Sequence, residues 1–136
     1  MTDQTRRVLE FLSDAASYAH RPARVTMVQT HASWVFIAPP LVCKIKKPVN
    51  LGFLDFSTLE LRRANCEREV ALNRRLAEDI YLGVESIREH NGRLGFGGGG
   101  EVVEWCVMMR ELDPRWFLSH LLKEGGVGAA EIGRTA

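Results

Sequence analysis

The chain has 136 residues, of which 46% are apolar and 26% charged, and its formal net charge is +1. This length fits one domain, and the chain is too apolar and too close to neutrality to be disordered. No run approaches the ~20 apolar residues of a membrane-spanning helix, and the N-terminus lacks the apolar stretch of a secretory signal. The near-neutral charge gives no reason to expect a nucleic-acid partner.

The first half of the chain predicts a helix followed by three strands. Residues 5–18 carry Val8, Leu9 and Leu12 at helical spacing, which is typical of an amphipathic helix. Three short runs rich in β-branched and aromatic residues follow, separated by tight connections that include Pro39-Pro40. We interpret these runs as antiparallel strands at 25–30, 34–38 and 41–47.

A capping box predicts the start of the next helix. Ser57 is followed three residues later by Glu60, and each side chain of such a pair can bind a free backbone N–H. We expect a long helix from there to about Ala77, with its Arg-rich outer surface in solvent. The inward stripe of this helix is expected to be Leu59, Cys66, Val70 and Asn73.

The remaining chain predicts further strands and then helices. Residues 84–87 and 93–96 flank an Asn91-Gly92 turn, and residues 101–109 form a strongly apolar strand. The glycines at 97–100 indicate a hairpin loop, because no Lys-Ser or Lys-Thr follows them as in a phosphate loop. Asp113-Pro114 favours a helix start, and residues 129–136 a further helical stretch. The order predicts an α+β fold, a five-stranded antiparallel sheet with one long helix between strands three and four.

The cysteines and histidines give no sign of a metal site. Cys43, Cys66 and Cys106 lie far apart among apolar neighbours, and the four histidines are equally scattered. We therefore expect three buried thiols in a reducing, cytoplasmic environment.

A cluster of lysines on the third strand carries the strongest chemical signal. Alternation along a strand places Val42, Lys44 and Lys46 on one face. A phosphate-binding lysine needs a stiff strand and an apolar residue two positions earlier to cover the nucleotide base. Lys44 meets both conditions, whereas Lys46 would place Lys44 against the base. We prefer Lys44, with Lys46 as the alternative.

Such a lysine needs a carboxylate that orients it, and Glu69 is the best candidate. Glu69 lies at the edge of the inward stripe of the long helix, whereas Glu67 points away from it by about 160°. The alternative for Glu69 is a surface carboxylate that pairs with Asn65 or Arg62.

Four segments together resemble a known bacterial family. They are 30–36 (THASWVF), 44–60 (KIKKPVNLGFLDFSTLE), 66–76 (CEREVALNRRL) and 102–110 (VVEWCVMMR). They resemble the aminoglycoside phosphotransferase-like proteins that are often fused to a P-loop ATPase domain. The resemblance covers nearly the whole chain and is most specific over residues 44–60.

This resemblance implies a kinase-like fold and transfer of the γ-phosphoryl group of ATP to a hydroxyl of an unknown small molecule. Residues 1–112 would be the N-terminal lobe and 113–136 the first helices of a truncated C-lobe. By analogy, Lys44 would hold the phosphates and Glu69 would fix Lys44. A loop at 31–33 would cover the phosphates, and residues 110–112 would form the hinge at the adenine edge. The candidate nucleotide-binding residues are Ser33, Val42, Lys44, Glu69, Met109, Arg110 and Leu112.

The catalytic part of such an enzyme is missing from the sequence. Phosphoryl transfer needs an aspartate for the substrate proton and ligands for magnesium, yet the chain has no H-x-D-x-x-x-x-N and no D-x-G pattern. We therefore expect an inactive fragment, with no catalytic residue or metal ligand of its own and magnesium bound only by the full-length parent. The surface that would contact the missing C-lobe would be exposed in such a fragment, and it would favour self-association. The alternatives are a non-catalytic kinase-like regulatory module and an anion- or nucleic-acid-binding domain that uses the basic residues of the third strand and long helix.

Overall fold

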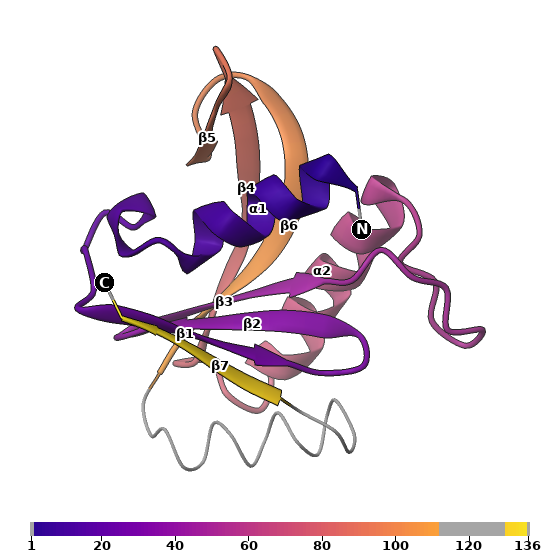
Figure 1. The fold of residues 1–136 in the computed structure, drawn as a ribbon. Coiled ribbons are helices and arrows are strands. Elements are labelled where there is room, and N and C mark those ends of the chain that lie inside the picture. Colours follow the sequence, from indigo (N-terminus) through magenta and orange to yellow (C-terminus); the bar gives the residue numbers. More distant parts are fainter. Residues whose placement is uncertain (1, 112–129, 136) are drawn as a thin grey trace.

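The structure is a computed structural model that describes residues 2–111 and the backbone of residues 130–135. It is a mixed α+β fold, built on one antiparallel sheet of seven strands in the order β5-β4-β6-β3-β2-β1-β7 (Figure 1). The helices are α1 (Asp3–Ser13) and α2 (Leu59–Arg74), with a short 3-10 turn, η1 (Ala15–Ser17). The strands are β1 (Arg24–Gln29), β2 (Ser33–Ala38), β3 (Leu41–Lys46), β4 (Tyr81–His90), β5 (Arg93–Phe96), β6 (Glu101–Arg110) and β7 (Ala130–Thr135).

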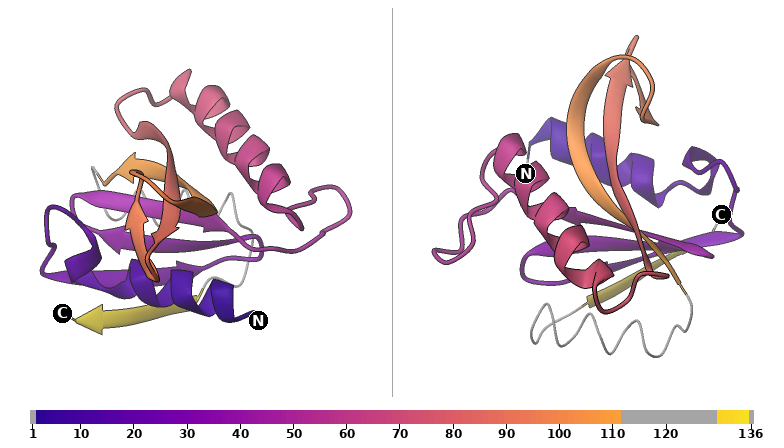
Figure 2. Two further views of the ribbon diagram at one scale, coloured as in Figure 1. Left: turned by 90° about the horizontal axis from the view of Figure 1, so that it is seen from above. Right: turned by 180° about the vertical axis from the view of Figure 1, so that it is seen from behind.

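The two helices pack on opposite faces of the curled sheet (Figure 2). On one face, Val8 and Leu12 of α1 pack against aromatic and apolar side chains of β2 and β3. On the other face, Cys66 and Val70 of α2 pack against Val42 and its neighbours. The alternation of side chains along the strands therefore divides the core into two layers. Neither described helix has the length and apolar character needed to cross a membrane.

The three-strand prediction for the first half of the chain is confirmed. Strands β1, β2 and β3 form an antiparallel meander, and β6 pairs with the free edge of β3. Lys44 consequently lies between Val35 of β2 and Val107 of β6, in the middle of the sheet. Helix α2 connects β3 to β4, as the chain order predicted.

The first helix is shorter than predicted, because a side chain interrupts it. Helix α1 ends at Ser13, and the backbone of Asp14 is extended. The Asp14 carboxylate accepts a hydrogen bond from the Ala16 N–H at 2.9 Å, which starts the separate turn η1. An N-cap interaction at Asp14 thus replaces the continuous helix expected to reach Tyr18.

The predicted capping box at Ser57 is wrong by one residue. Thr58 is the N-cap of α2, and its hydroxyl accepts a hydrogen bond from the Leu61 N–H at 3.1 Å. The Ser57 N–H donates to the Asp55 carboxylate at 2.9 Å, so Ser57 belongs to the preceding loop. Helix α2 ends at Arg74, three residues before the predicted Ala77.

This difference gives a test by substitution. Thr58→Ala removes the acceptor for a free N–H of α2 and is expected to lower the free energy of unfolding by about 1 kcal/mol. Ser57→Ala removes only an exposed hydroxyl, keeps the N–H that donates to Asp55, and is expected to cost less than about 0.5 kcal/mol. Urea denaturation of both variants measures the difference, and a larger loss for Ser57→Ala would return the cap to Ser57.

The sheet has seven strands rather than the predicted five. The segment around Asn91-Gly92 contributes two of them, β4 and β5, and both turn residues have positive φ. The glycine loop that follows allows close approach of the backbone, because a Cβ at Gly100 would lie 2.2 Å from the carbonyl oxygen of Glu89. The hairpin loop predicted at 97–100 is wrong, because β5 and β6 both pair with β4 and not with each other, so the glycines carry the chain past the end of β4.

The helix predicted at 129–136 is wrong, because residues 130–135 form β7. This strand pairs antiparallel with β1, from Arg24 opposite Thr135 to Gln29 opposite Ala130. Without it, β1 would present a row of unpaired N–H and C=O groups, and this pairing outweighs a weak helical tendency interrupted by Gly133. The helix predicted after Asp113 lies outside the described residues.

Candidate functional site

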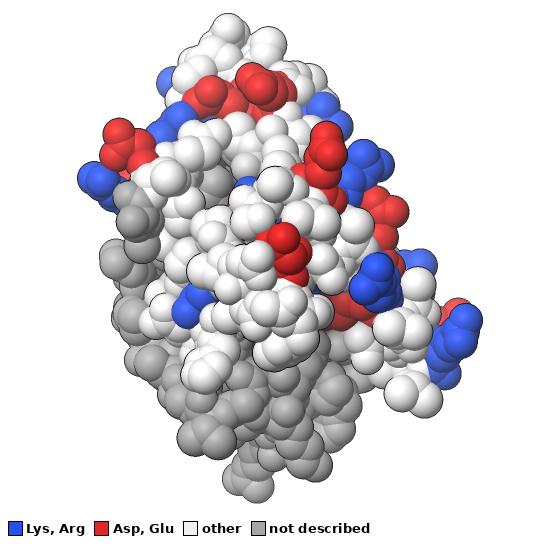
Figure 3. Space-filling model, turned by 90° about the vertical axis from the view of Figure 1, so that its right-hand side faces the viewer, with Lys and Arg blue, Asp and Glu red and all other residues white. Residues whose placement is uncertain are grey.

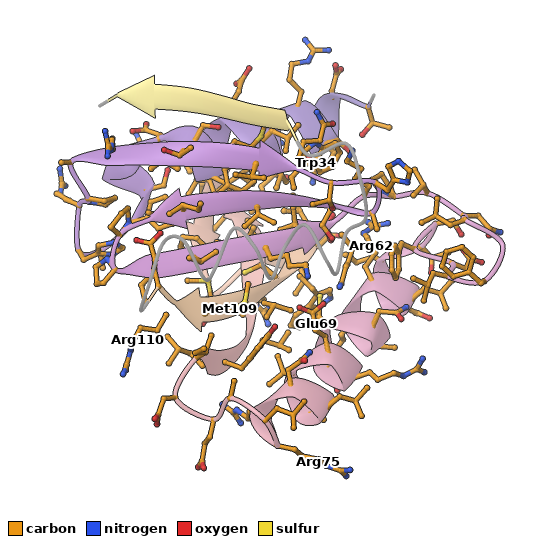
Figure 4. The ribbon with its side chains drawn as sticks, turned by 90° about the horizontal axis from the view of Figure 1, so that it is seen from below. Trp34, Arg62, Glu69, Arg75, Met109 and Arg110 are labelled. Carbon is orange, nitrogen blue, oxygen red and sulfur yellow. The ribbon has the colours of Figure 1, made fainter. Side chains whose placement is uncertain are left out.

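Three charged side chains meet between the sheet and α2. The Lys44 ammonium lies 3.1 Å from Oε2 of Glu69, and the Lys46 ammonium contacts Oε1 of the same carboxylate. The side chains are almost withdrawn from solvent, because Lys44, Lys46 and Glu69 are 4%, 7% and 8% exposed. Figure 4 shows Glu69 extending from α2 toward the sheet. One helix carboxylate therefore binds two strand lysines.

The local structure explains why these groups converge. Alternation along β3 directs Lys44 and Lys46 to the face that α2 covers, as predicted. Glu69 lies one turn after Cys66 on the buried stripe of α2. The alternative for Glu69 is wrong, because the side chain of Asn65 donates to the carbonyl of Leu61 and Arg62 binds another carboxylate.

The environment of Glu69 favours its ionised form. Burial is the largest influence and raises the pKa of this carboxyl group, but the charges and hydrogen bonds of Lys44 and Lys46 together outweigh it. The pKa of Glu69 is therefore lower than usual. A carboxylate held ionised in this way can fix the position of an ammonium group.

A second buried ion pair adjoins the first and was not predicted. Arg62 Nε donates to Oε2 of Glu104 at 2.9 Å, and another guanidinium nitrogen donates to the carbonyl of Phe56 at 2.9 Å. Both charged side chains are nearly buried, although the arginines of this helix were expected to lie in solvent. Helical spacing could have indicated the burial of Arg62, because Arg62 precedes Cys66 by four residues and therefore lies on the same face of the helix.

Other predicted residues lie on the same face of the sheet as Lys44. Val42 is fully buried and lies opposite Met109 of β6 in the ladder. Ser33 begins β2 opposite Lys46, and its N–H donates to the hydroxyl of Thr30 at 3.1 Å. The Ser33 N–H is thus used within its own turn. The fold brings Ser33, Val42, Lys44, Met109 and Glu69 to one layer.

The described residues of the predicted hinge, Arg110 and Glu111, are not part of this layer. Arg110 is exposed and points away from Glu69 (Figure 4). The N–H of Arg110 donates to the carbonyl of Ile80 at 2.8 Å, and that of Glu111 to Pro40 at 2.9 Å. These two donors are engaged within the fold, and Leu112 lies outside the described residues.

Among the described residues, several basic side chains that the sequence suggested for an anion-attracting surface are engaged within the fold. Lys44, Lys46 and Arg62 are buried in ion pairs, and Arg63 pairs with Glu67 at 2.8 Å. Figure 3 shows basic and acidic side chains interspersed on one side of the molecule. The two lysines of β3 therefore lie in the interior and are not part of the molecular surface.

The cysteine prediction is confirmed for packing. Cys43, Cys66 and Cys106 are buried and form no disulfide. Burial is the main reason that the pKa of the Cys66 thiol rises to about 12, so this group stays protonated at neutral pH.

Comparison with known proteins identifies relatives but no function. Uncharacterized proteins of Mycobacterium tuberculosis (Rv2004c and MT2060) and Mycobacterium bovis (Mb2027c) are each 42% identical to this chain over 97 residues. The match covers 71% of this chain but only 18% of each relative. No family model matches the chain, and no solved structure does.

Proposed function

We propose that this chain binds ATP and serves as the nucleotide-binding, N-terminal part of a kinase-like small-molecule phosphotransferase. The observation that carries the proposal is the ion pair of Lys44 with Glu69, which joins the middle of the sheet to the helix between β3 and β4. In phosphoryl transfer of the kinase type, a strand lysine held by a helix glutamate binds the phosphates. The resemblance of residues 44–60 to aminoglycoside phosphotransferase-like proteins agrees with this assignment.

The residues present suit a polyphosphate ligand. Lys44 supplies an ammonium group that Glu69 orients, and Val42 supplies an apolar surface two residues earlier on the same face. Because Lys44 is only 4% exposed, the proposal requires this face of the sheet to open when phosphate binds. Glu69 holds Lys44 in place before binding, and the Lys44 ammonium then turns to phosphate oxygens.

Transfer chemistry would need groups beyond this sequence. The chain has neither of the aspartate motifs that would accept the substrate proton and bind magnesium. ATP would supply the transferable phosphoryl group, and this chain would contribute binding and orientation alone. The acceptor is proposed to be a hydroxyl of a small molecule bound by another part of a longer protein.

The binding step can be tested with one lysine variant. Lys44→Met is expected to weaken binding of ATP with magnesium by about 10- to 100-fold, the loss expected for one charge-assisted hydrogen bond. Isothermal titration calorimetry measures the change, with circular dichroism to show that the variant is folded.

Lys47→Met is the matched control. Lys47 lies three residues after Lys44, but its ammonium lies over the Trp34 ring, 5.4 Å from the centroid, and donates to Gln29. We expect its ATP affinity to stay within about threefold of the unmodified chain. Equal losses in both variants, or no binding of ATP by the unmodified chain, would contradict the proposed function.

A further inference from the structure

We propose that Lys46 is a positioning residue: it holds the Glu69 carboxylate in place so that Lys44 can donate to phosphate. This inference rests on the proposed function and assigns different tasks to two lysines that share one carboxylate. Lys44 is the ligand-binding ammonium, and Lys46 is the fixed one.

The surroundings of Lys46 fix its position. Its ammonium contacts Oε1 of Glu69 and lies 5.5 Å from the centroid of the Phe56 ring. Phe56 is itself anchored, because its N–H donates to Val49 at 2.8 Å and its carbonyl accepts from Arg62 at 2.9 Å. Carboxylate, ring and loop therefore enclose the Lys46 side chain.

Lys44 has a different setting. It lies in the middle of the sheet between Val35 and Val107, two residues after Val42. It contacts the other oxygen of Glu69, at 3.1 Å. The two ammonium groups thus use separate carboxylate oxygens, and one can change partner while the other stays bound.

A second lysine solves an electrostatic problem. When the only cationic partner of a buried carboxylate turns to phosphate, the carboxylate is left nearly unpaired, at a large cost in free energy. Lys46 removes this cost because it continues to neutralise Glu69. Lys44 can then donate to a phosphate oxygen without forcing Glu69 to take up a proton.

The ionisable neighbours of Glu69 support this division. Lys44 and Lys46 face it from β3, Cys66 interacts with it from α2, and β4 places Tyr81 in the same layer. From β6, Glu104 faces α2 but is bound by Arg62. Burial raises the pKa of Glu69 and the two lysines reverse that effect, so removal of either lysine should raise it.

Carbon-13 NMR of the Glu69 carboxyl group tests the inference without nucleotide. Lys46→Met is expected to raise the titration midpoint of Glu69 by about one pH unit or more, a tenfold change in proton affinity. Lys46→Arg restores the charge and is expected to return the midpoint close to that of the unmodified chain. A lysine that only fills space would be replaced equally well by methionine.

Calorimetry in two buffers of different ionisation enthalpy tests the role in binding. At pH 6.5, binding of ATP with magnesium should take up almost no proton in the unmodified chain or in Lys46→Arg. In Lys46→Met, binding should be about tenfold weaker and should take up a fraction of a proton, because Glu69 protonates when Lys44 turns to phosphate. If Lys46→Met does not fold, Lys46→Gln replaces it.

NMR of the lysine side chains in the unmodified chain adds a measurement that needs no substitution. ATP should shift the resonances of Lys44 and leave those of Lys46 in place. Larger shifts at Lys46, or a Glu69 midpoint unchanged in Lys46→Met, would overturn the inference whatever the ATP affinity. Absence of ATP binding to the unmodified chain would instead overturn the proposed function, and the Glu69 titration would still decide whether Lys46 holds the carboxylate.

Discussion

Replacing Glu69 by Gln is expected to lower the free energy of unfolding by about 3–5 kcal/mol, the cost of breaking a buried ion pair by removing one partner. The substitution keeps the size of the side chain but removes the charge that two buried lysines contact. Lys46 then remains beside Phe56 without its carboxylate. Urea denaturation at pH 7 measures the loss.

Glu67→Gln is the matched control on the same helix. Glu67 lies two residues earlier, is half exposed and pairs with Arg63 four residues away. An exposed pair of this kind contributes little, so the expected loss is below about 0.5 kcal/mol. The double variant Glu69→Gln/Lys46→Met should be more stable than the two separate losses would predict, because it removes an ammonium together with its partner. Equal losses for Glu67→Gln and Glu69→Gln would show that the buried ion pairs of Glu69 stabilise the fold no more than an exposed pair does.

The sequence was informative where the pattern is local. Alternation along β3 predicted that Val42 and Lys44 share a face, and helical spacing predicted that Glu69 lies at the buried edge of α2. These predictions require only the periods of a strand and a helix. They became a contact because α2 crosses the face of β3 that carries the lysines.

Pairings between distant parts of the chain were not predictable in the same way. Glu104 lies 42 residues after Arg62, and nothing in either local pattern indicates the other. The strand at 130–135 is set by the free edge of β1, which sequence periodicity does not record. The contact of both lysines with Glu69 depends on the distance between α2 and the sheet. The sequence could therefore favour Lys44 over Lys46 as the partner of Glu69, but it could not predict that both bind it.

The second large effect is expected at Arg62. Arg62→Met keeps the length of the buried side chain but leaves the Phe56 carbonyl without this donor and the Glu104 carboxylate without its cation, with the Trp105 N–H still donating to Glu104 at 3.0 Å. We expect a loss of about 3–5 kcal/mol in the free energy of unfolding at pH 7.5. Arg63→Met is the control, since Arg63 is exposed and loses only its pair with Glu67 and its contact with the Trp105 ring.

The pH dependence of this loss identifies the charge responsible. Burial already raises the pKa of Glu104, and Arg62 opposes that effect, so the Arg62→Met variant should have a still higher pKa at this group. A carboxyl group whose pKa is higher in the folded than in the unfolded state gives stability at low pH, which is lost as the pH rises through the folded-state value. The stability difference between Arg62→Met and the unmodified chain should therefore be smaller at pH 4.5 than at pH 7.5. A difference that does not change between these pH values would show that Arg62 acts through the Phe56 carbonyl and packing, and that Glu104 is not the charge it neutralises.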